Sequence, residues 1–260
     1  MIVTLLHRAS AVVVTMLVAA AGADAPVSPQ PLPVDCPAVL SAAAAPPPAW
    51  SATTAHGIHR FDRSAVIEVP AAPTALTVEL WGAGGGGGGG SEDTFTEAGA
   101  GGGGGASGGY ARGTFAVSSA SRYTVVVGLA GEGGTVHADG RGGGASAICE
   151  NGKALLFAAG GPGGAGTVSN NDGGAGGKWE GRAVENPLLD GGWQHDGHNG
   201  HRGSAPLFAW RGLGGHGGAP VRGTIELSAS QGGDGGAGAM RPDPAQRGHA
   251  GGDGAVVIAW

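Results

Sequence analysis

Residues 75–109 read ALTVELWGAGGGGGGGSEDTFTEAGAGGGGGASGG. The first seven alternate, with Leu76, Val78 and Leu80 on one face, which is the pattern of a half-buried β-strand. The chain then passes directly into glycine, which destabilises helix interiors by about 1 kcal/mol per residue. All but two of the 58 glycines follow residue 81, whereas ten of the 16 prolines lie at or before Pro73. This separation argues against collagen, which needs glycine and proline in the same repeat.

The later glycine tracts have a period of three residues. Copies of GGxGGx begin at residues 160, 173, 214 and 232, and read GGPGGA, GGAGGK, GGHGGA and GGDGGA. A polyglycine II helix has three residues per turn and no internal hydrogen bonds, so its backbone groups must pair with neighbouring helices. A side chain on a packed edge would block that approach, whereas the third edge accepts any residue. We therefore predict bundled polyglycine II helices; the alternative is disordered glycine linkers.

Strand-like segments separate these tracts. The sequence Glu150-Asn151-Gly152-Lys153 lies between two of them and carries Asn-Gly, the strongest short hairpin signal. The pattern predicts an all-β fold, namely a jelly-roll-like β-sandwich with bundled polyglycine II helices between its strands. The tracts at 82–90 and 99–109 flank SEDTFTEA and predict a further helix pair. The predicted strands cover residues 59–69, 75–81, 110–117, 122–128, 145–149, 154–158, 223–229 and 255–260.

The N-terminal part predicts export. Residues 1–23 combine Arg8, an apolar run and the small-residue sequence Ala21-Gly22-Ala23, which is typical of a cleaved signal peptide. The alternative is a membrane anchor, but the run is shorter than the roughly 20 residues that span a bilayer. Residues 24–56 are rich in Pro and Ala and predict an extended linker, which leaves 57–260 as the folded domain. We expect a secreted or cell-surface protein, extracellular or periplasmic, with no stable membrane span after signal cleavage.

The chain has two cysteines, Cys36 and Cys149. In an oxidising compartment two thiols of an exported chain are usually paired, so we expect a Cys36–Cys149 disulfide. In the alternative interpretation Cys149 is a small buried strand residue and Cys36 lies in a disordered tail.

Composition and motifs argue against several functions. The formal net charge of −6 disfavours nucleic-acid binding. Gly-x-Gly-x-x-Gly arises repeatedly from composition alone, and the only lysines, Lys153 and Lys178, lie in no phosphate-binding loop signature. G-x-S-x-G occurs at 105–109, inside a glycine tract, and no strand–turn–helix unit is predicted there that could form a nucleophile elbow. We expect a protein that is not an enzyme and needs no cofactor.

One cluster suggests a metal site. His195, His198 and His201 recur every three residues, with Asp196 among them. In a polyglycine II conformation they would share one edge, spaced about 9 Å per turn, where imidazoles are typical ligands of Zn²⁺ or Cu²⁺. The alternative is a solvated polar edge.

Residues 178–211 are the best candidate for a recognition loop, because glycine thins out there. Tryptophan and arginine are the residues most enriched at binding hot spots, and a flat indole also suits stacking on a sugar. The alternative is that the tryptophans cover the polyglycine bundle or fill a second small core. The candidate binding residues are Trp179, Trp193, Trp210, Arg202 and Arg211, with Arg182 beside them.

The chain resembles a known family over roughly residues 60–260. ALTVELWGAGGGGGGG, GGASGGYARGTFAVSSASRYTVVVGLAGEGG, GGGASAI, ALLFAAGGPGGAG and GGDGAVVIAW occur in the order of the glycine-rich domain of bacterial exported and phage tail-fibre proteins. They are also similar to the extracellular glycine-rich domain of anaplastic lymphoma kinase receptors. The resemblance implies a β-sandwich with polyglycine II helices, receptor-binding loops in the tail-fibre relatives, a contribution to ligand recognition in the receptors, and no catalytic residues.

These observations predict an exported, non-enzymatic surface module that acts in adhesion or recognition. Its partner would be a cell-surface glycan or a protein receptor. The alternative is a self-assembling extracellular structural protein, a filament or matrix subunit.

Overall fold

The computed structural model describes residues 57–69, 75–94, 97–117, 121–167, 172–179, 193–207, 210–224, 229–240 and 243–260. The predicted signal peptide, the predicted linker and Cys36 lie outside these ranges. All described residues belong to one compact unit of the chain, Leu32–Trp260. None of the described ranges forms a helix with the length and apolar character needed to cross a membrane.

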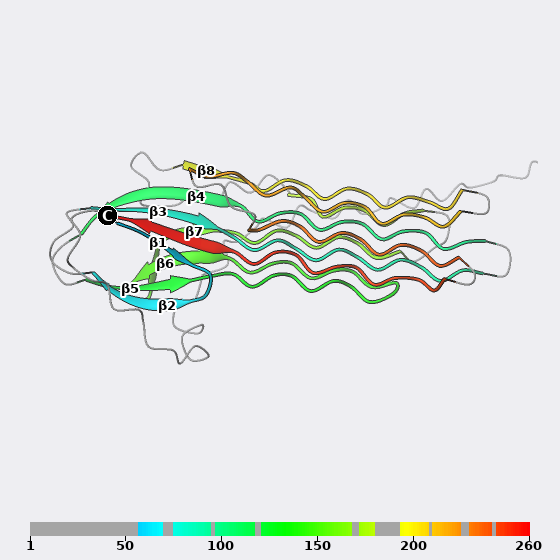
Figure 1. Cartoon of the computed structure of the whole chain (residues 1–260), viewed down its shortest axis with the longest axis horizontal. Helices are drawn as coiled ribbons and strands as arrows, with labels where there is room; N and C mark the ends of the chain where they lie inside the picture. Colours follow the sequence, from blue (N-terminus) through cyan, green and yellow to red (C-terminus); the bar gives the residue numbers. More distant parts are fainter. Residues whose placement is uncertain are drawn as a thin grey trace, which may run out of the picture. The chain divides into compact units, whose positions relative to one another are not determined.

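The strands form two antiparallel sheets, so the all-β prediction is confirmed (Figure 1). The five-stranded sheet has the order β1-β9-β3-β4-β8, and the four-stranded sheet has the order β2-β5-β6-β7. The Asn151-Gly152 signal is confirmed, because β6 and β7 form a hairpin around it. The strands are β1 (Ile58–Phe61), β2 (Ala65–Val69), β3 (Ala75–Trp81), β4 (Tyr110–Ala116), β5 (Ser121–Val126), β6 (Ser146–Glu150), β7 (Lys153–Ala158), β8 (Trp193–His195) and β9 (Ala255–Ala259).

The hydrophobic core lies where the two sheets face each other. Leu76, Val78 and Leu80, the residues of the predicted alternation, are fully buried there together with Ile67 of β2 and Ile148 of β6. Burial of one such side chain contributes roughly 1.5–3 kcal/mol. This core fixes the sheets, and the glycine tracts begin where the strands end.

The predicted strand over 59–69 is wrong as one element. The chain bends at residues 62–64, and the two halves enter different sheets, since β1 pairs with β9 and β2 pairs with β5. Asp62 and Arg63 are exposed, while the Ser64 hydroxyl accepts a hydrogen bond from the Val127 N–H at 3.0 Å. Of the predicted strand over 223–229, residues 223–224 are not in a strand and 225–228 lie outside the described residues. The short strand β8 was not predicted.

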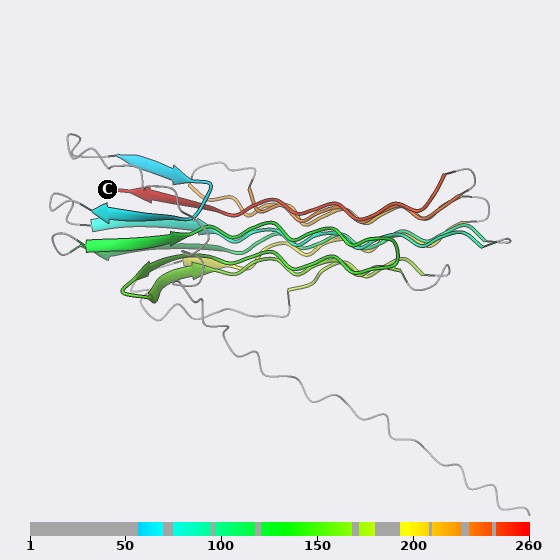
Figure 2. The same ribbon diagram turned by 90° about the horizontal axis from the view of Figure 1, so that it is seen from below.

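The glycine tracts form extended segments that continue from the strands and run side by side (Figures 1 and 2). Their hydrogen bonds join one segment to another. We call them the glycine segments and their assembly the bundle. They cover residues 82–91, 99–109, 128–137, 138–145, 159–167, 172–179, 196–205, 211–222, 230–240 and 244–254.

Segment 82–91 is surrounded on all sides. Successive N–H groups donate to three neighbours in turn, and the order repeats every three residues, which is the repeat of a polyglycine II helix. Gly85 donates to Ala106 and Gly88 donates to Gly103, so this pair runs antiparallel. The carbonyls accept from three further segments. The donor partners are 99–109, 138–145 and 244–254, and the acceptor partners are 128–137, 159–167 and 230–240.

Segments with fewer neighbours contain fewer glycines, between one and two per turn where three or four neighbours remain. Segment 82–91 has six neighbours and glycine on every edge; a Cβ added at Gly87 would collide with the Asp234 carbonyl. Segment 230–240 bonds to four neighbours, and its GGDGGA keeps two glycines per turn. Segment 196–205 bonds to three neighbours and retains one glycine per turn. Where neighbours are missing, at least one edge is therefore open for side chains to reach the surface.

Candidate functional surface

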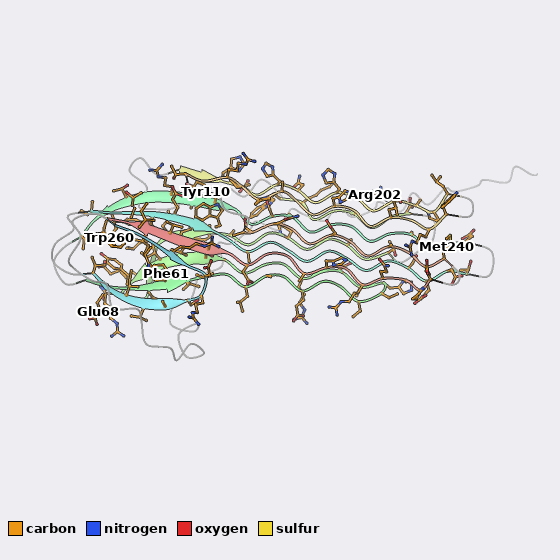
Figure 3. All side chains as sticks on the ribbon, in the orientation of Figure 1. Phe61, Glu68, Tyr110, Arg202, Met240 and Trp260 are labelled. Atoms are coloured by element: carbon orange, nitrogen blue, oxygen red, sulfur yellow. The ribbon has the colours of Figure 1, made fainter. Side chains whose placement is uncertain are left out.

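Segment 196–205 forms part of the outside of the bundle. Gly197, Gly200 and Gly203 pack against segment 99–109, where an added Cβ would collide with its carbonyls. The residues between these glycines are exposed, and Arg202 lies on the outside of the bundle (Figure 3). The predicted recognition loop 178–211 is therefore wrong as a single loop, because its described second half is a packed segment of the bundle.

Trp179 covers the bundle. Its indole Nε1 donates to the Ser107 carbonyl at 3.0 Å, and its backbone N–H donates to Asn199 Oδ1 at 2.8 Å. The side chain is partly buried. These contacts favour the covering role over recognition for this tryptophan.

Trp210 lies in a different environment. It is 73% exposed, and Leu207 and Leu213 beside it are 69% and 65% exposed. Leu207 and Trp210 exchange two backbone hydrogen bonds, of 3.1 and 2.9 Å, which close a tight turn between segments 196–205 and 211–222. We call residues 205–213 the apolar turn; residues 208 and 209 lie outside the described residues.

The structure does not gather the five predicted binding residues. Trp179 contacts segment 99–109 at Ser107. Next to the apolar turn, the Ser204 carbonyl accepts a hydrogen bond from the Gly101 N–H of the same segment. Six residues of an extended segment separate these two levels, which is about 19 Å at 3.1 Å per residue. Trp193 pairs with Arg112 through its backbone, and its side chain lies outside what the structure describes.

The two arginines are engaged in local contacts. Arg202 donates from Nε to the Gly173 carbonyl at 3.0 Å and lies 3.8 Å from Asp172. Arg211 donates to Asp243 Oδ2 at 3.5 Å, which joins the apolar turn to the neighbouring turn at 240–243. Only Arg211 therefore belongs to the same surface as Trp210.

The three histidines lie along one side of the structure. His195 is in β8, opposite Tyr110, while His198 and His201 are exposed on segment 196–205. The rings of His195 and His198 have centroids 6.0 Å apart. Burial raises the pKa of Asp196 between them, and His195 opposes that shift. Across the described ranges, no three His, Cys, Asp or Glu side chains are arranged to hold a metal ion.

The profile of the glycine-rich domain family matches residues 61–260. The chain belongs to this family. No curated protein sequence matches the chain significantly.

This glycine-rich domain contains a buried polar cluster that the sequence analysis missed. On the outer face of the five-stranded sheet, Glu79 is 5% exposed and lies 3.6 Å from Arg112 Nε, and one of its carboxylate oxygens has no hydrogen-bond partner. Burial, and then the charge of Glu79, raise the pKa of Tyr110 to about 12. Trp81 Nε1 donates to the Val221 carbonyl at 2.9 Å, and Val221 packs against Trp81 and Tyr110 beside the cluster. The signal for it was the alternation of β3, which places Glu79 on this face.

Cys149 is buried on β6 and is not a free thiol. Cys36 lies outside the described residues, so the Cys36–Cys149 pairing of the glycine-rich domain stays a prediction.

Proposed function

We propose that this glycine-rich domain is an exported, non-enzymatic surface module that binds a cell-surface glycan or protein receptor through the apolar turn. One observation carries the proposal. Among the described residues five large hydrophobic side chains are exposed, and three of them, Leu207, Trp210 and Leu213, lie in this one turn. Single exposed apolar residues need no explanation, but a cluster of them marks an interaction site.

The bundle suits the task of presenting such a turn. Backbone hydrogen bonds of 2.8–3.0 Å tie the segments on both sides of it to segment 99–109. Leu207, Trp210 and Leu213 are thus attached to an ordered support before a partner arrives, which reduces the entropy lost on binding. Its exposed tryptophan belongs to the residue type most often found at binding hot spots.

The resemblance to phage tail-fibre proteins and to kinase receptors supports the same role. In the similar phage tail-fibre proteins the glycine bundle displays receptor-binding loops, and in the similar kinase receptors it contributes to ligand recognition. Export in this chain rests on the signal-peptide pattern of residues 1–23.

The test is binding of the purified mature protein to cells and to an immobilised glycan panel. Trp210→Ala should weaken binding at least tenfold, while the melting temperature changes little because the ring is exposed. Leu129→Ala is the matched control, since Leu129 is 76% exposed on another segment and its loss should leave binding unchanged. Equal binding by wild type and Trp210→Ala would contradict the proposal. Polymers in light scattering that Trp210→Ala abolishes would favour the self-assembling structural protein instead.

A further inference from the structure

The four-stranded sheet is buried on both of its faces. Ile148 of β6 belongs to the core between the two sheets, whereas Ala147 and Cys149, its neighbours along the strand, belong to a separate cluster on the outer face. Ala147 is 0% exposed, Cys149 is 1% exposed, and Val126 of β5 in the same cluster is 4% exposed. One face of an antiparallel sheet usually packs on the core while the other meets water. The burial of this outer face therefore calls for a further covering segment.

The described part of the chain does not supply the apolar side chains of that cover. The outer cluster consists of Val126 of β5, Ala147 and Cys149 of β6, and the partly buried Ala154 and Phe157 of β7. All five residues belong to the sheet itself, and within the described ranges no hydrophobic residue from elsewhere packs on them. The covering segment is therefore to be sought outside those ranges.

The bonding of Cys149 identifies this segment. Its sulfur is bonded in a disulfide and is not a free thiol. The chain contains only one other cysteine, Cys36. The compact unit that contains both sheets begins at Leu32, so the stretch around Cys36 belongs to it and not to the preceding unit, Met1–Pro31. These observations point to the residues that flank Cys36 as the partner of the outer face.

Residues 32–40 have the composition of a covering segment. They read LPVDCPAVL, in which one charged residue, Asp35, stands among apolar ones. Contact with Val126 and Phe157 would remove apolar surface of both partners from water, which favours docking. Residues 24–31, by contrast, read DAPVSPQP and contain one large aliphatic residue, Val27. The large apolar residues of 32–40 are Leu32, Val34, Val39 and Leu40.

The chain between Cys36 and the first strand is long enough for this connection. Residues 37–56 separate Cys36 from Gly57, and twenty extended residues span up to about 66 Å. Gly57 pairs with Trp260 at the end of the sheets that is away from the bundle (Figure 1). Strand β6 follows segment 138–145 and runs away from the bundle, so Cys149, next to its last residue, lies toward the same end. The reach of the chain therefore permits the disulfide.

We propose that residues 32–40 dock on the outer face of the four-stranded sheet, where a Cys36–Cys149 disulfide holds them. Formation of the bond converts two thiols into one S–S bond and releases two protons and two electrons. The electrons pass to a thiol–disulfide oxidant of an oxidising compartment. The predicted linker 24–56 is thereby divided, because its middle part belongs to the folded domain. This inference does not depend on what the apolar turn binds.

The first experiment tests the bond in the mature protein, secreted into an oxidising compartment. Digestion without reduction, followed by mass spectrometry of the monomer band of a non-reducing gel, should give one linked peptide pair that contains Cys36 and Cys149. Dithiothreitol should lower the melting temperature of the wild type by about 10 °C, because the bond closes the long loop between residues 36 and 149. Cys36→Ser is the matched control, since it lacks the bond and its melting temperature should not respond to dithiothreitol.

A second experiment separates docking from simple tethering. Val34→Asp places a carboxylate in the docked segment, where burial of an unpaired charge is unfavourable. In the oxidised protein it should lower the melting temperature by about 5 °C. It should also raise the fluorescence of ANS, a dye that binds exposed apolar surface, at least twofold. Val27→Asp makes the same change before the compact unit begins and should alter neither quantity.

Three results would overturn the proposal. The first is a secreted monomer with two free thiols, and the second is a disulfide that joins two copies of the chain. The third is an effect of Val34→Asp no larger than that of Val27→Asp, which would mean that the bond tethers the segment without docking it. If Val34→Asp does not fold, Val34→Ala takes its place, with a smaller expected loss and the matched control Val27→Ala.

Discussion

The sheets and the bundle are stabilised in opposite ways. In the sheets, side chains such as Leu80 fill the space between two layers and are fully buried. In the bundle, segment 82–91 is equally buried, yet it has almost no side chains, and its contacts are backbone hydrogen bonds to six neighbours. The two regions of this chain are therefore destabilised by opposite kinds of substitution. Removing buried side-chain atoms destabilises the sheets, whereas adding a side chain to a packed glycine destabilises the bundle.

The largest effect should follow the addition of one methyl group at the centre of the bundle. Gly87→Ala places a Cβ against the carbonyl of Asp234, which is backbone and has no room to move. We expect a loss of unfolding free energy of more than about 4 kcal/mol, measured by urea denaturation. Gly142→Ala is the control, because the nearest atom to its Cβ is 3.6 Å away. Equal unfolding free energies for the two variants would show that close backbone packing does not determine the stability of the bundle.

The next effect is the reverse change in the sheets. Leu80→Ala removes atoms from the core and should cost about 3 kcal/mol, as buried leucine truncations do. The same urea series measures it. Leu129→Ala, at a residue that is 76% exposed, should change stability by less than about 0.5 kcal/mol. An equal loss in the two variants would mean that burial in the sheets does not decide stability.

Alkaline pH should weaken the sheets through Tyr110. Its folded pKa of about 12 lies above the usual value near 10, so folding favours the protonated phenol. That contribution is complete below pH 10 and is lost as the pH rises through 12, by roughly 2–3 kcal/mol. Tyr110→Phe has no such group and should lose less stability between pH 9 and pH 12. Identical pH dependence of the two proteins would contradict the shift.

The smallest effect concerns the border of the bundle, where side chains take over from missing neighbours. Asp139 Oδ1 accepts a hydrogen bond from the Gly166 N–H at 2.8 Å. Asp139→Ala should cost about 0.5–1 kcal/mol, the usual net value of one hydrogen bond. Glu132→Ala, which removes an exposed ion pair with Arg141 at 3.8 Å, should have less effect. The two are compared by thermal unfolding, and a larger loss for Glu132→Ala would contradict this assignment.

Local pattern predicted most strands, but apart from the hairpin at Asn151-Gly152 it did not predict which strands pair. The alternation over 75–81 places three leucine or valine side chains in the core, as the structure has them. HRFDRSAVIEV reads as one strand because no glycine or proline interrupts it at Asp62 and Arg63. Only the pairing with strands far along the chain divides it into β1 and β2.

The candidate site was less predictable, because the exposure of its side chains also depends on contacts between segments that are distant in sequence. Trp179 and Trp210 look alike in sequence, and their exposure depends on which segments lie next to them. The sequence GHNGHRG over 197–203 does hold one usable signal, since a single glycine per turn indicates an outer segment with few neighbours.

The position of β9 has a consequence for the order in which the protein can be made. This strand, from Ala255 to Ala259, lies between β1 and β3, so two early strands of the five-stranded sheet are joined only by the last strand of the fold. Segment 82–91 likewise takes its partners from residues as late as 252. Contacts so distant in sequence slow folding. The five-stranded sheet is therefore completed only after β9 has been synthesised, and a nascent chain that stops before Ala255 lacks the strand that joins β1 to β3.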